Sequence, residues 1–368
     1  MGGDFLFKRI ICILLVLSNI GIKVDAQEIS ARSAVLYEPV TNRILYEKNA
    51  EQKLPMASTT KIITAITAIE NGNLSDVITT SKRAADVEGS SVWLCEGEKQ
   101  TLENLLYGLM LSSGNDAAIA IAEHIGGYDK FVEMMNNTAK KAGAVNTSLK
   151  NPNGLDEEGH YTTALDMALI SAYAMKNQKF REIVSTKEKV IPWEGHNWGR
   201  TLKNHNKLLR IYEGANGIKT GFTKKDGRCL VSSAERNGVM LICVTLNAPN
   251  DWNDHKTLLD MGFSVLETKL VLTEDKTVKV ENSNTEYITV KAERQMHIPV
   301  KQEDKTEVVY IVPETLPAPV RVNDVVGKAQ VFLNGKMVEE VNMVARETAE
   351  KSLNFFDYFY KMVIQMLN

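Results

Sequence analysis

The sequence predicts a mixed α/β (α+β) fold, in which an antiparallel sheet packs against a mainly helical region and a small all-β domain follows. Three observations lead to this prediction. Strand-like apolar runs lie both near the start of the chain and after residue 217, so they can pair into one sheet. The segment between them has the three- and four-residue apolar spacing that is typical of helices. Residues 271–345 alternate in short strand-like runs with prolines in the turns.

The first expected elements are a β-hairpin and a helix. Residues 34–38 and 44–48 are short apolar runs on either side of a turn that begins at Pro39, which predicts the hairpin. Residues 58–70 carry isoleucines at helical spacing on one side, and Gly72 is a natural end for the helix they predict.

More helices follow, separated by a tight turn. Thr101 is a good N-cap for a helix over residues 102–111, and another is expected over residues 116–125. The turn at residues 112–115 joins these two helices. Two further helical segments are expected, over residues 128–142 and 163–176.

The pattern changes to strands after residue 217. Residues 229–234 and 240–246 are two β-rich runs separated by Asn237-Gly238, a strong hairpin signal, and residues 255–263 return to helix. The later all-β domain is expected to contain strands at residues 278–280, 287–290, 308–312 and 330–333.

The composition is that of an ordinary globular protein of more than one domain. The 368 residues are 44% hydrophobic and 24% charged, which excludes a disordered chain. The net charge of -3 and the absence of a basic stripe in the sequence argue against nucleic-acid binding. Apart from Cys12, which lies in the leader, three cysteines remain and show no metal-ligand spacing, so no disulfide framework is expected.

The N-terminus resembles an export signal. Lys8 and Arg9 precede an apolar run over residues 10–20, which is too short to span a bilayer as a helix. Ala26 supplies the small residue expected at a cleavage point. We therefore interpret residues 1–26 as a signal peptide, and we expect the mature protein to work outside the cytoplasm.

The C-terminus, residues 346–368, has an amphipathic helical pattern. Its apolar side chains recur at three- and four-residue steps: Leu353, Phe356, Tyr360, Val363 and Leu367. One interpretation is a helix docked on its own domain. The other, which we favour, is an anchor lying in the interface of the bacterial membrane. The predicted domains are thus residues 27–270, with the chemistry described next, and the all-β domain at residues 271–345.

Ser58 and Lys61 form the first candidate catalytic pair. At a helix start, positions i and i+3 share a face, so the Lys61 amine can reach the Ser58 hydroxyl. A serine hydroxyl becomes a strong nucleophile only when a base removes its proton, and a desolvated lysine can be that base. Alone the pair is weak evidence, because serine and lysine are common.

Two further motifs follow in order. Ser113-Gly114-Asn115 lies in the predicted turn between helices, where a hydroxyl and a carboxamide can point into a cleft, although all three residues are also ordinary turn formers. Lys219-Thr220-Gly221 lies on a predicted edge strand, where lysine and threonine can hold a carboxylate and glycine allows close approach. The alternative for this last motif is an edge strand protected by lysine.

Together, Ser-x-x-Lys, Ser-x-Asn and Lys-Thr-Gly are the signature set of penicillin-binding proteins and class A β-lactamases. The chain resembles the serine-type D-alanyl-D-alanine carboxypeptidases, the low-molecular-mass penicillin-binding proteins, over residues 33–270. Similar stretches also occur at residues 151–156, 159–164 and 204–209. The resemblance implies a penicillin-binding/β-lactamase-like serine transpeptidase fold and removal of the terminal D-Ala from peptidoglycan stem peptides. It also implies acylation by β-lactam inhibitors.

The resemblance implies catalytic roles for three residues. Ser58 is expected to be the nucleophile and Lys61 its general base. Ser113 is expected to relay a proton to the leaving nitrogen, while Lys219 holds the local charge.

It implies substrate-binding roles for Lys219 and for four more residues. Asn115 is expected to bind the substrate's peptide amide, and Thr220 to accept the terminal carboxylate beside Gly221. The backbone N–H groups of Ser58 and Phe222 are expected to form the oxyanion hole. The histidines lack a metal-ligand pattern and are interpreted as loop or core residues. No metal or organic cofactor is expected.

Two departures from the family pattern stand out. Phe222 follows Lys-Thr-Gly where some relatives have histidine. Some relatives also place an arginine near the substrate carboxylate, in the loop after the last sheet strand. Residues 250–254 are acidic here, so carboxylate recognition must fall on Thr220 and Lys219, or on a residue that the sequence does not identify.

Three alternatives remain from the sequence. A β-lactamase uses the same motifs, but it adds a carboxylate that activates water, and no Glu-x-x-x-Asn arrangement occurs near residues 151–156. A D,D-endopeptidase has identical chemistry and differs only in cleft shape. An inactive wall-binding module would have no reason to keep all three motifs.

Overall fold

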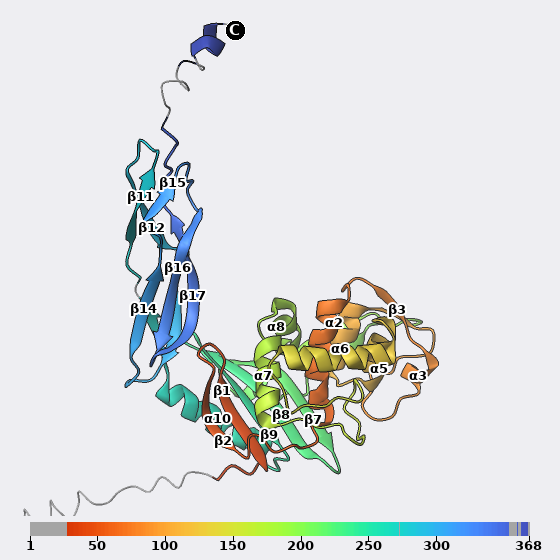
Figure 1. Ribbon diagram of the computed structural model, residues 1–368. Helices are drawn as coiled ribbons and strands as arrows, with labels where there is room; N and C mark the ends of the chain where they lie inside the picture. The colour runs from red at the N-terminus through yellow and green to blue at the C-terminus, as the bar shows by residue number, and fades with distance from the viewer. Residues whose placement is uncertain (1–27, 272, 353–358, 360–361, 367–368) are drawn as a thin grey trace, which may run out of the picture.

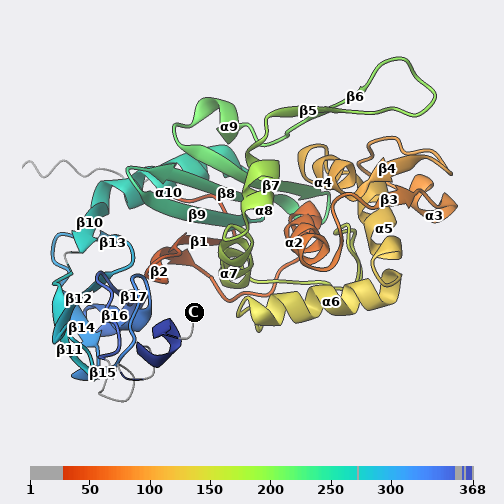
Figure 2. The ribbon, with the colours of Figure 1, turned by 90° about the horizontal axis from the view of Figure 1, so that it is seen from above.

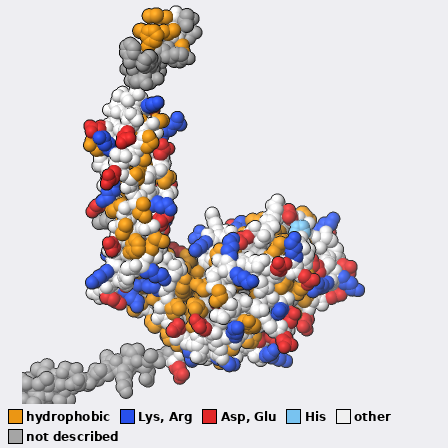
Figure 3. Space-filling model, viewed as in Figure 1, with side chains coloured by type: hydrophobic (Ala, Val, Ile, Leu, Met, Phe, Trp, Pro, Cys, Tyr) orange, Lys and Arg blue, Asp and Glu red, His pale blue; other side chains and the backbone are white. Residues whose placement is uncertain are grey.

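The computed structural model describes residues 28–271, 273–352, 359 and 362–366. The predicted signal peptide and most of the predicted C-terminal helix lie outside these residues. The described chain forms a wide α+β part and a narrow β part that extends from one side of it (Figure 1). Acidic and basic side chains are interspersed over the face seen in Figure 3.

The central sheet joins strands from the two ends of the α+β part. Its order is β2-β1-β9-β8-β7, and every pairing is antiparallel. The strands are β1 (Ser33–Glu38), β2 (Arg43–Lys48), β7 (Ala215–Thr223), β8 (Gly227–Arg236) and β9 (Val239–Leu246). The predicted pairing of early and late strands is confirmed by β1 and β9, where Ser33 lies opposite Leu246. Strand β7 forms one edge of the sheet.

Helices cover both faces of this sheet, so β1 is buried at every position. On one face Leu36 and Cys243 pack with Leu258 of α10 (Asp251–Val265). On the other face Val35 joins the larger core, which contains the helical region. Figure 2 shows α10 on one side of the sheet, with α7 (Ala164–Ala174) and α8 (Gln178–Ser185) on the other.

The helical region follows the predicted order. A short 3-10 turn, η1 (Ala57–Thr60), leads into α2 (Lys61–Asn71), in which Ile62, Ile63 and Ile66 are buried. Thr101 caps α4 (Leu102–Leu111) as predicted, because its side chain accepts a hydrogen bond from the Asn104 N–H. The remaining helices are α3 (Lys82–Ala85), α5 (Asn115–His124), α6 (Tyr128–Lys141) and α9 (Leu208–Ile211).

Two small pairs of strands and the helices α3, α8 and α9 were not anticipated from the sequence. Strand β3 (Val77–Thr79) pairs with β4 (Lys99–Thr101), and β5 (Glu188–Ile191) pairs with β6 (Arg200–Lys203). These strands have three or four residues each, too few for the alternation of side chains to stand out.

The β part contains two sheets around its own apolar core. The larger sheet has the order β14-β16-β17-β12-β11-β15, and β10 pairs with β13. The bounds are β10 (Glu267–Val271), β11 (Lys276–Glu281), β12 (Tyr287–Ala292), β13 (Met296–Val300), β14 (Thr306–Ile311), β15 (Thr315–Pro317), β16 (Val325–Leu333) and β17 (Lys336–Ala345). The first of these strands thus begins before the predicted boundary at residue 271. An ion pair links this part to the central sheet: Arg43 Nη1 of β2 lies 2.5 Å from Asp304 Oδ2.

The start of the predicted C-terminal helix needs correction. Residues 346–352 are not helical: residues 346 and 347 form a bend, Ala349 bridges to Val320 and Lys351 bridges to Ser283. Ala349 is fully buried against the β part, which holds this stretch out of a helix. Among the residues of the tail that the structure describes, 362–366 are helical.

Candidate active site

The start of α2 presents the Ser58 hydroxyl to Lys61. Ala57 has a positive φ of 47°, which is uncommon for a residue with a side chain and turns the chain sharply into η1. Lys61, the first residue of α2, lies on the same face one turn later. Its Nζ is 3.0 Å from Ser58 Oγ.

The Lys61 amine is buried among oxygen atoms. Besides Ser58 it contacts Asn115 Oδ1 at 2.7 Å and the Asn153 carbonyl oxygen at 2.5 Å. Burial lowers the pKa of Lys61 well below its usual value, Lys219 lowers it further, and Asp116 opposes them. A neutral amine has two N–H groups, which can donate hydrogen bonds to the Asn115 and Asn153 oxygens. Its lone pair is then directed at the Ser58 hydroxyl, as a general base requires.

The turn between α4 and α5 supplies a hydroxyl and a carboxamide. Ser113 has a φ of 62°, and within the described part of the chain its buried Oγ has no hydrogen-bond partner. Asn115 is fixed at both ends of its amide: Nδ2 donates to the Glu88 carbonyl at 2.6 Å, and Oδ1 accepts from Lys61. Among the described residues, this turn therefore leaves one hydroxyl unpaired at the wall of the cleft, and it holds the carboxamide through two hydrogen bonds.

Strand β7 lies against the turn that carries Ser58. A Cβ added to Gly221 would be 3.1 Å from the backbone nitrogens of Ser58 and Thr59, so a larger residue would force the two backbones apart by a few tenths of an ångström. Lys219 on the same strand is 1% exposed, and its Nζ donates to the Thr220 carbonyl at 3.0 Å. Burial lowers the pKa of Lys219 to about 7.

A cleft of about 330 Å³ opens over these residues. It is lined by Ser58, Ser90, Ser113, His205, Lys207, Thr220, Gly221, Phe222, Arg228, Asp251 and Trp252. Every predicted site residue therefore either lines this cleft or, like Lys61, Asn115 and Lys219, is buried beside it. Within the described ranges, no group of three or more His, Cys, Asp or Glu residues is arranged to hold a metal ion.

Six lining residues were not anticipated. Ser90, His205 and Lys207 lie in loops, Arg228 lies at the start of β8, and Asp251 and Trp252 begin α10, so no short motif connects these residues. His205, interpreted from the sequence as a loop or core residue, borders the cleft, and burial together with Lys219 lowers its pKa. Arg228 could have been identified as the residue opposite Phe222 across the β7–β8 hairpin.

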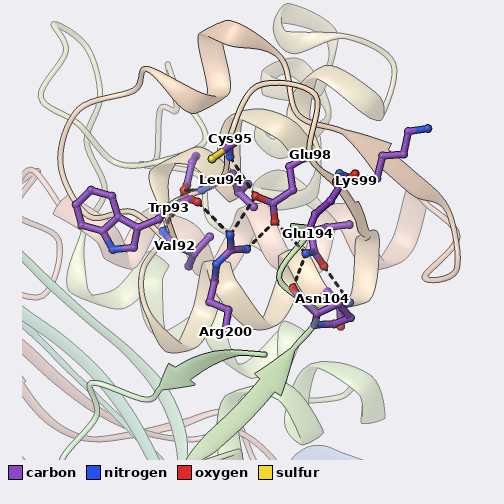
Figure 4. A network of polar contacts seen from close by, with 12 residues as sticks. Val92, Trp93, Leu94, Cys95, Glu98, Lys99, Asn104, Glu194 and Arg200 are labelled. Carbon is purple, nitrogen blue, oxygen red and sulfur yellow. Dashed lines mark hydrogen bonds and ion pairs between the residues drawn. The ribbon is translucent and has the colours of Figure 1, made fainter. Parts of the chain in front are cut away.

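A buried ion pair secures the loop that carries Ser90. Figure 4 shows the Arg200 guanidinium between the Glu98 carboxylate and the Trp93 carbonyl. Its two terminal nitrogens contact the two Glu98 oxygens at 2.8 and 3.0 Å, and Nη2 also donates to the Trp93 oxygen at 3.0 Å. From the other side, Asp116 accepts the N–H groups of Val92 and Leu94. These contacts therefore restrain the loop that forms the Ser90 wall of the cleft.

Comparison with protein families gives two matches along the chain. The family model described as D-alanyl-D-alanine carboxypeptidase matches residues 21–250, and the C-terminal domain of penicillin-binding protein 5 matches residues 263–351. D-alanyl-D-alanine carboxypeptidase DacF of Bacillus subtilis is 35% identical, over 88% of this chain and 86% of that protein. DacC of Escherichia coli is 31% identical, over 93% and 89%.

Solved structures agree with these matches. Penicillin-binding protein 5 of Haemophilus influenzae superposes with a TM-score of 0.66 at 28% identity, covering 88% of this chain and 98% of that one. The Streptomyces K15 DD-transpeptidase gives 0.62 at 34% identity, covering 65% and 98%. The predicted fold, an antiparallel sheet with helices and then an all-β domain, is confirmed. The chain belongs to the D-alanyl-D-alanine carboxypeptidase family.

Proposed function

We propose that this enzyme removes the terminal D-Ala from peptidoglycan stem peptides through an acyl-enzyme on Ser58. The observation that carries the proposal is the contact between Lys61 Nζ and Ser58 Oγ, together with the two acceptors that orient the amine. This arrangement places a base of lowered pKa against a nucleophile at a helix start, where the helix dipole favours developing negative charge.

In the acylation step, the Ser58 proton moves to the neutral Lys61 amine while Oγ bonds to the carbonyl carbon of the D-Ala–D-Ala peptide. The carbonyl electrons move onto oxygen, where the N–H groups of Ser58 and Phe222 stabilise them. The close approach of Gly221 to the Ser58 backbone supports this oxyanion hole.

When the intermediate collapses, the C–N bond breaks and the leaving nitrogen must gain a proton. The Ser113 hydroxyl, which lines the cleft and has no other partner among the described residues, passes this proton from Lys61 to the D-Ala amine. Asn115 holds the substrate amide, Thr220 receives the carboxylate, and Lys219 supplies positive charge nearby. Water then hydrolyses the ester, which frees Ser58 for another cycle.

β-Lactams are expected to acylate Ser58 by the same steps, since a strained lactam amide replaces the peptide. A Ser58→Ala variant tests the proposal directly. Intact-mass measurement with a fluorescent penicillin should show a single adduct on the wild-type chain and none on the variant, at equal thermal stability. An adduct on the variant would remove Ser58 from the mechanism. Rapid steady-state turnover of nitrocefin by the wild type would favour the β-lactamase alternative. A long-lived adduct would favour the carboxypeptidase.

The cell location is proposed from the segments near the two ends of the sequence. Residues 1–26 are proposed to direct export, and the C-terminal segment to attach the enzyme to the outer face of the cytoplasmic membrane. No helix among the described residues is long and apolar enough to cross a bilayer. Four described side chains of the tail are apolar and exposed, Phe359, Met362, Ile364 and Met366, and hydrophobic atoms gather at this end in Figure 3. They support attachment along the membrane surface.

A further inference from the structure

The cleft contains a cation that the mechanism above does not use. Arg228 lies at the start of β8 and lines the same cleft as Ser58 and Thr220. Its side chain is 42% exposed, so a ligand in the cleft can reach it. Arginine stays protonated at every pH at which proteins fold.

Arg228 and Thr220 share one face of the β7–β8 hairpin. The register places Arg228 directly opposite Phe222 and Leu230 opposite Thr220. Because side chains of a strand alternate between faces, Thr220, Phe222 and Arg228 point to the same side. Thr220 is the diagonal neighbour of Arg228, at a separation of roughly 7–8 Å that a long side chain bridges.

The guanidinium is held in place from behind. Arg228 Nη2 lies 3.0 Å from Asp251 Oδ2, and the Asp251 side chain is 3% exposed at the first turn of α10. The Trp252 ring lies 5.8 Å from the guanidinium carbon. A buried carboxylate on one side and an aromatic ring on another restrain the Arg228 side chain at the wall of the cleft that it lines.

The ion pair with Arg228 gives a role to Asp251, one of the acidic residues in the segment 250–254. Where some relatives offer an arginine from the loop after the last sheet strand, this chain offers the carboxylate that positions an arginine of the neighbouring strand. Lys219 is a weaker candidate for the same task, because its Nζ is buried against the Thr220 carbonyl and its pKa is lowered to about 7 by burial.

We propose that Arg228 binds the C-terminal carboxylate of the substrate peptide beside Thr220, and that Asp251 is its positioning residue. This assignment rests on the proposed carboxypeptidase function. The planar guanidinium fork matches a carboxylate with two parallel hydrogen bonds, which a lysine ammonium cannot reproduce. Arg228 thereby selects peptides that end in a free carboxylate.

The test compares two peptides that differ only at the C-terminus: a diacetylated L-Lys-D-Ala-D-Ala and its C-terminal amide. In the mature full chain, Arg228→Gln should lower kcat/KM for the free acid by about 10- to 100-fold, the usual cost of a lost charge-assisted hydrogen bond. It should change kcat/KM for the amide by less than about threefold. Arg228→Lys should give an intermediate loss, and Asp251→Asn a partial loss that is confined to the acid.

Two further variants make the comparison specific. Arg236→Gln is the matched control, because Arg236 lies at the far end of β8 and pairs with Asp260. Lys207→Gln tests the rival cation in the cleft. Equal losses on both peptides for Arg228→Gln, or a loss specific to the acid for Lys207→Gln instead, would overturn the assignment. If wild-type protein cleaves neither peptide, the proposed function itself fails, so the two failures are distinguishable.

Discussion

Lys219 lowers the pKa of Lys61, although the two lysines belong to different layers of the fold. Lys61 begins helix α2, Lys219 lies on the edge strand β7, and their side chains are 0% and 1% exposed. Burial is the largest cause of the lowered pKa at Lys61, and the Lys219 charge adds to it. The strand that is proposed to bind substrate thus also tunes the proposed base.

Replacing Lys219 by glutamine should therefore raise the pKa of Lys61. The base acts only when unprotonated, so kcat/KM for penicillin acylation rises as pH increases through that pKa. In Lys219→Gln the acidic limb of the profile should move to higher pH. Acylation rates measured between about pH 4 and pH 9 report this, with Lys224→Gln in the exposed β7–β8 turn as the charge control. A limb that stays in place or moves down in pH contradicts the coupling.

Lys61→Arg tests the base itself. Guanidinium keeps the positive charge but is not deprotonated in proteins, so it cannot accept the Ser58 proton. Acylation by penicillin should slow by about 10³-fold or more, in line with the loss of general-base catalysis. Stopped-flow acylation and a thermal melt separate this effect from unfolding. Near-normal acylation at neutral pH would exclude Lys61 as the base.

Gly221→Ala tests the close approach of β7 to the Ser58 turn. The added Cβ would lie 3.1 Å from the backbone nitrogens of Ser58 and Thr59, and backbone atoms cannot move aside cheaply. Because the proposed oxyanion hole uses N–H groups of these two segments, a small displacement should cost about 10²-fold in acylation rate. The measurement is kcat/KM for acylation beside the melting temperature. An unchanged rate would mean that the strand does not form the hole.

The sequence predicted the elements that follow from local rules. The Thr101 cap, the Asn237-Gly238 hairpin and the three motifs depend on residues a few positions apart, and the structure has each of them where expected. The cleft walls do not follow such rules. Arg228 and Asp251 are brought together by the pairing of β8 with its neighbours and by the start of α10, so their contact is a tertiary property.

The C-terminal segment shows that a local pattern can also predict a helix that the structure does not contain. Residues 346–352 fit a helical pattern, but Ala349 gains more by filling the core of the β part and bridging to Val320. Packing thus overrides local propensity, which is a weak preference for any single residue. The apolar side chains that recur at helical spacing begin only at Leu353, so their pattern did not fix where the helix starts.

The Arg200–Glu98 pair should stabilise the fold more than a surface ion pair. Both side chains are nearly inaccessible, at 6% and 3% exposure, and the contact is bidentate. Arg200→Gln leaves a buried carboxylate without its partner, so we expect a loss of about 3–5 kcal/mol in the free energy of unfolding. Denaturant melts of Arg200→Gln, Glu98→Gln and the double variant measure it. If the single and double variants lose the same small amount, the pair does not secure the loop.

The last prediction concerns attachment to the membrane and uses two truncations. Ending the chain after Ser352 removes the amphipathic segment and keeps the Ala349 and Lys351 bridges. This variant should be as stable and as active on a short D-Ala-D-Ala peptide as the mature chain. It should stay in the supernatant with anionic liposomes, whereas the mature chain co-sediments. Burial of apolar area stabilises the bound state by roughly 25 cal/mol per Å², so several exposed apolar side chains suffice for reversible binding.

Ending the chain after Ala345 is the matched contrast, because it also removes Ala349, which is fully buried. That variant should lose stability in the β part, seen as a lower melting temperature, while the Ser352 truncation melts like the mature chain. The difference separates anchoring from folding. If the Ser352 truncation melts early instead, the tail is a docking element of its own domain. If the mature chain does not sediment with liposomes, the membrane interpretation of the tail is wrong.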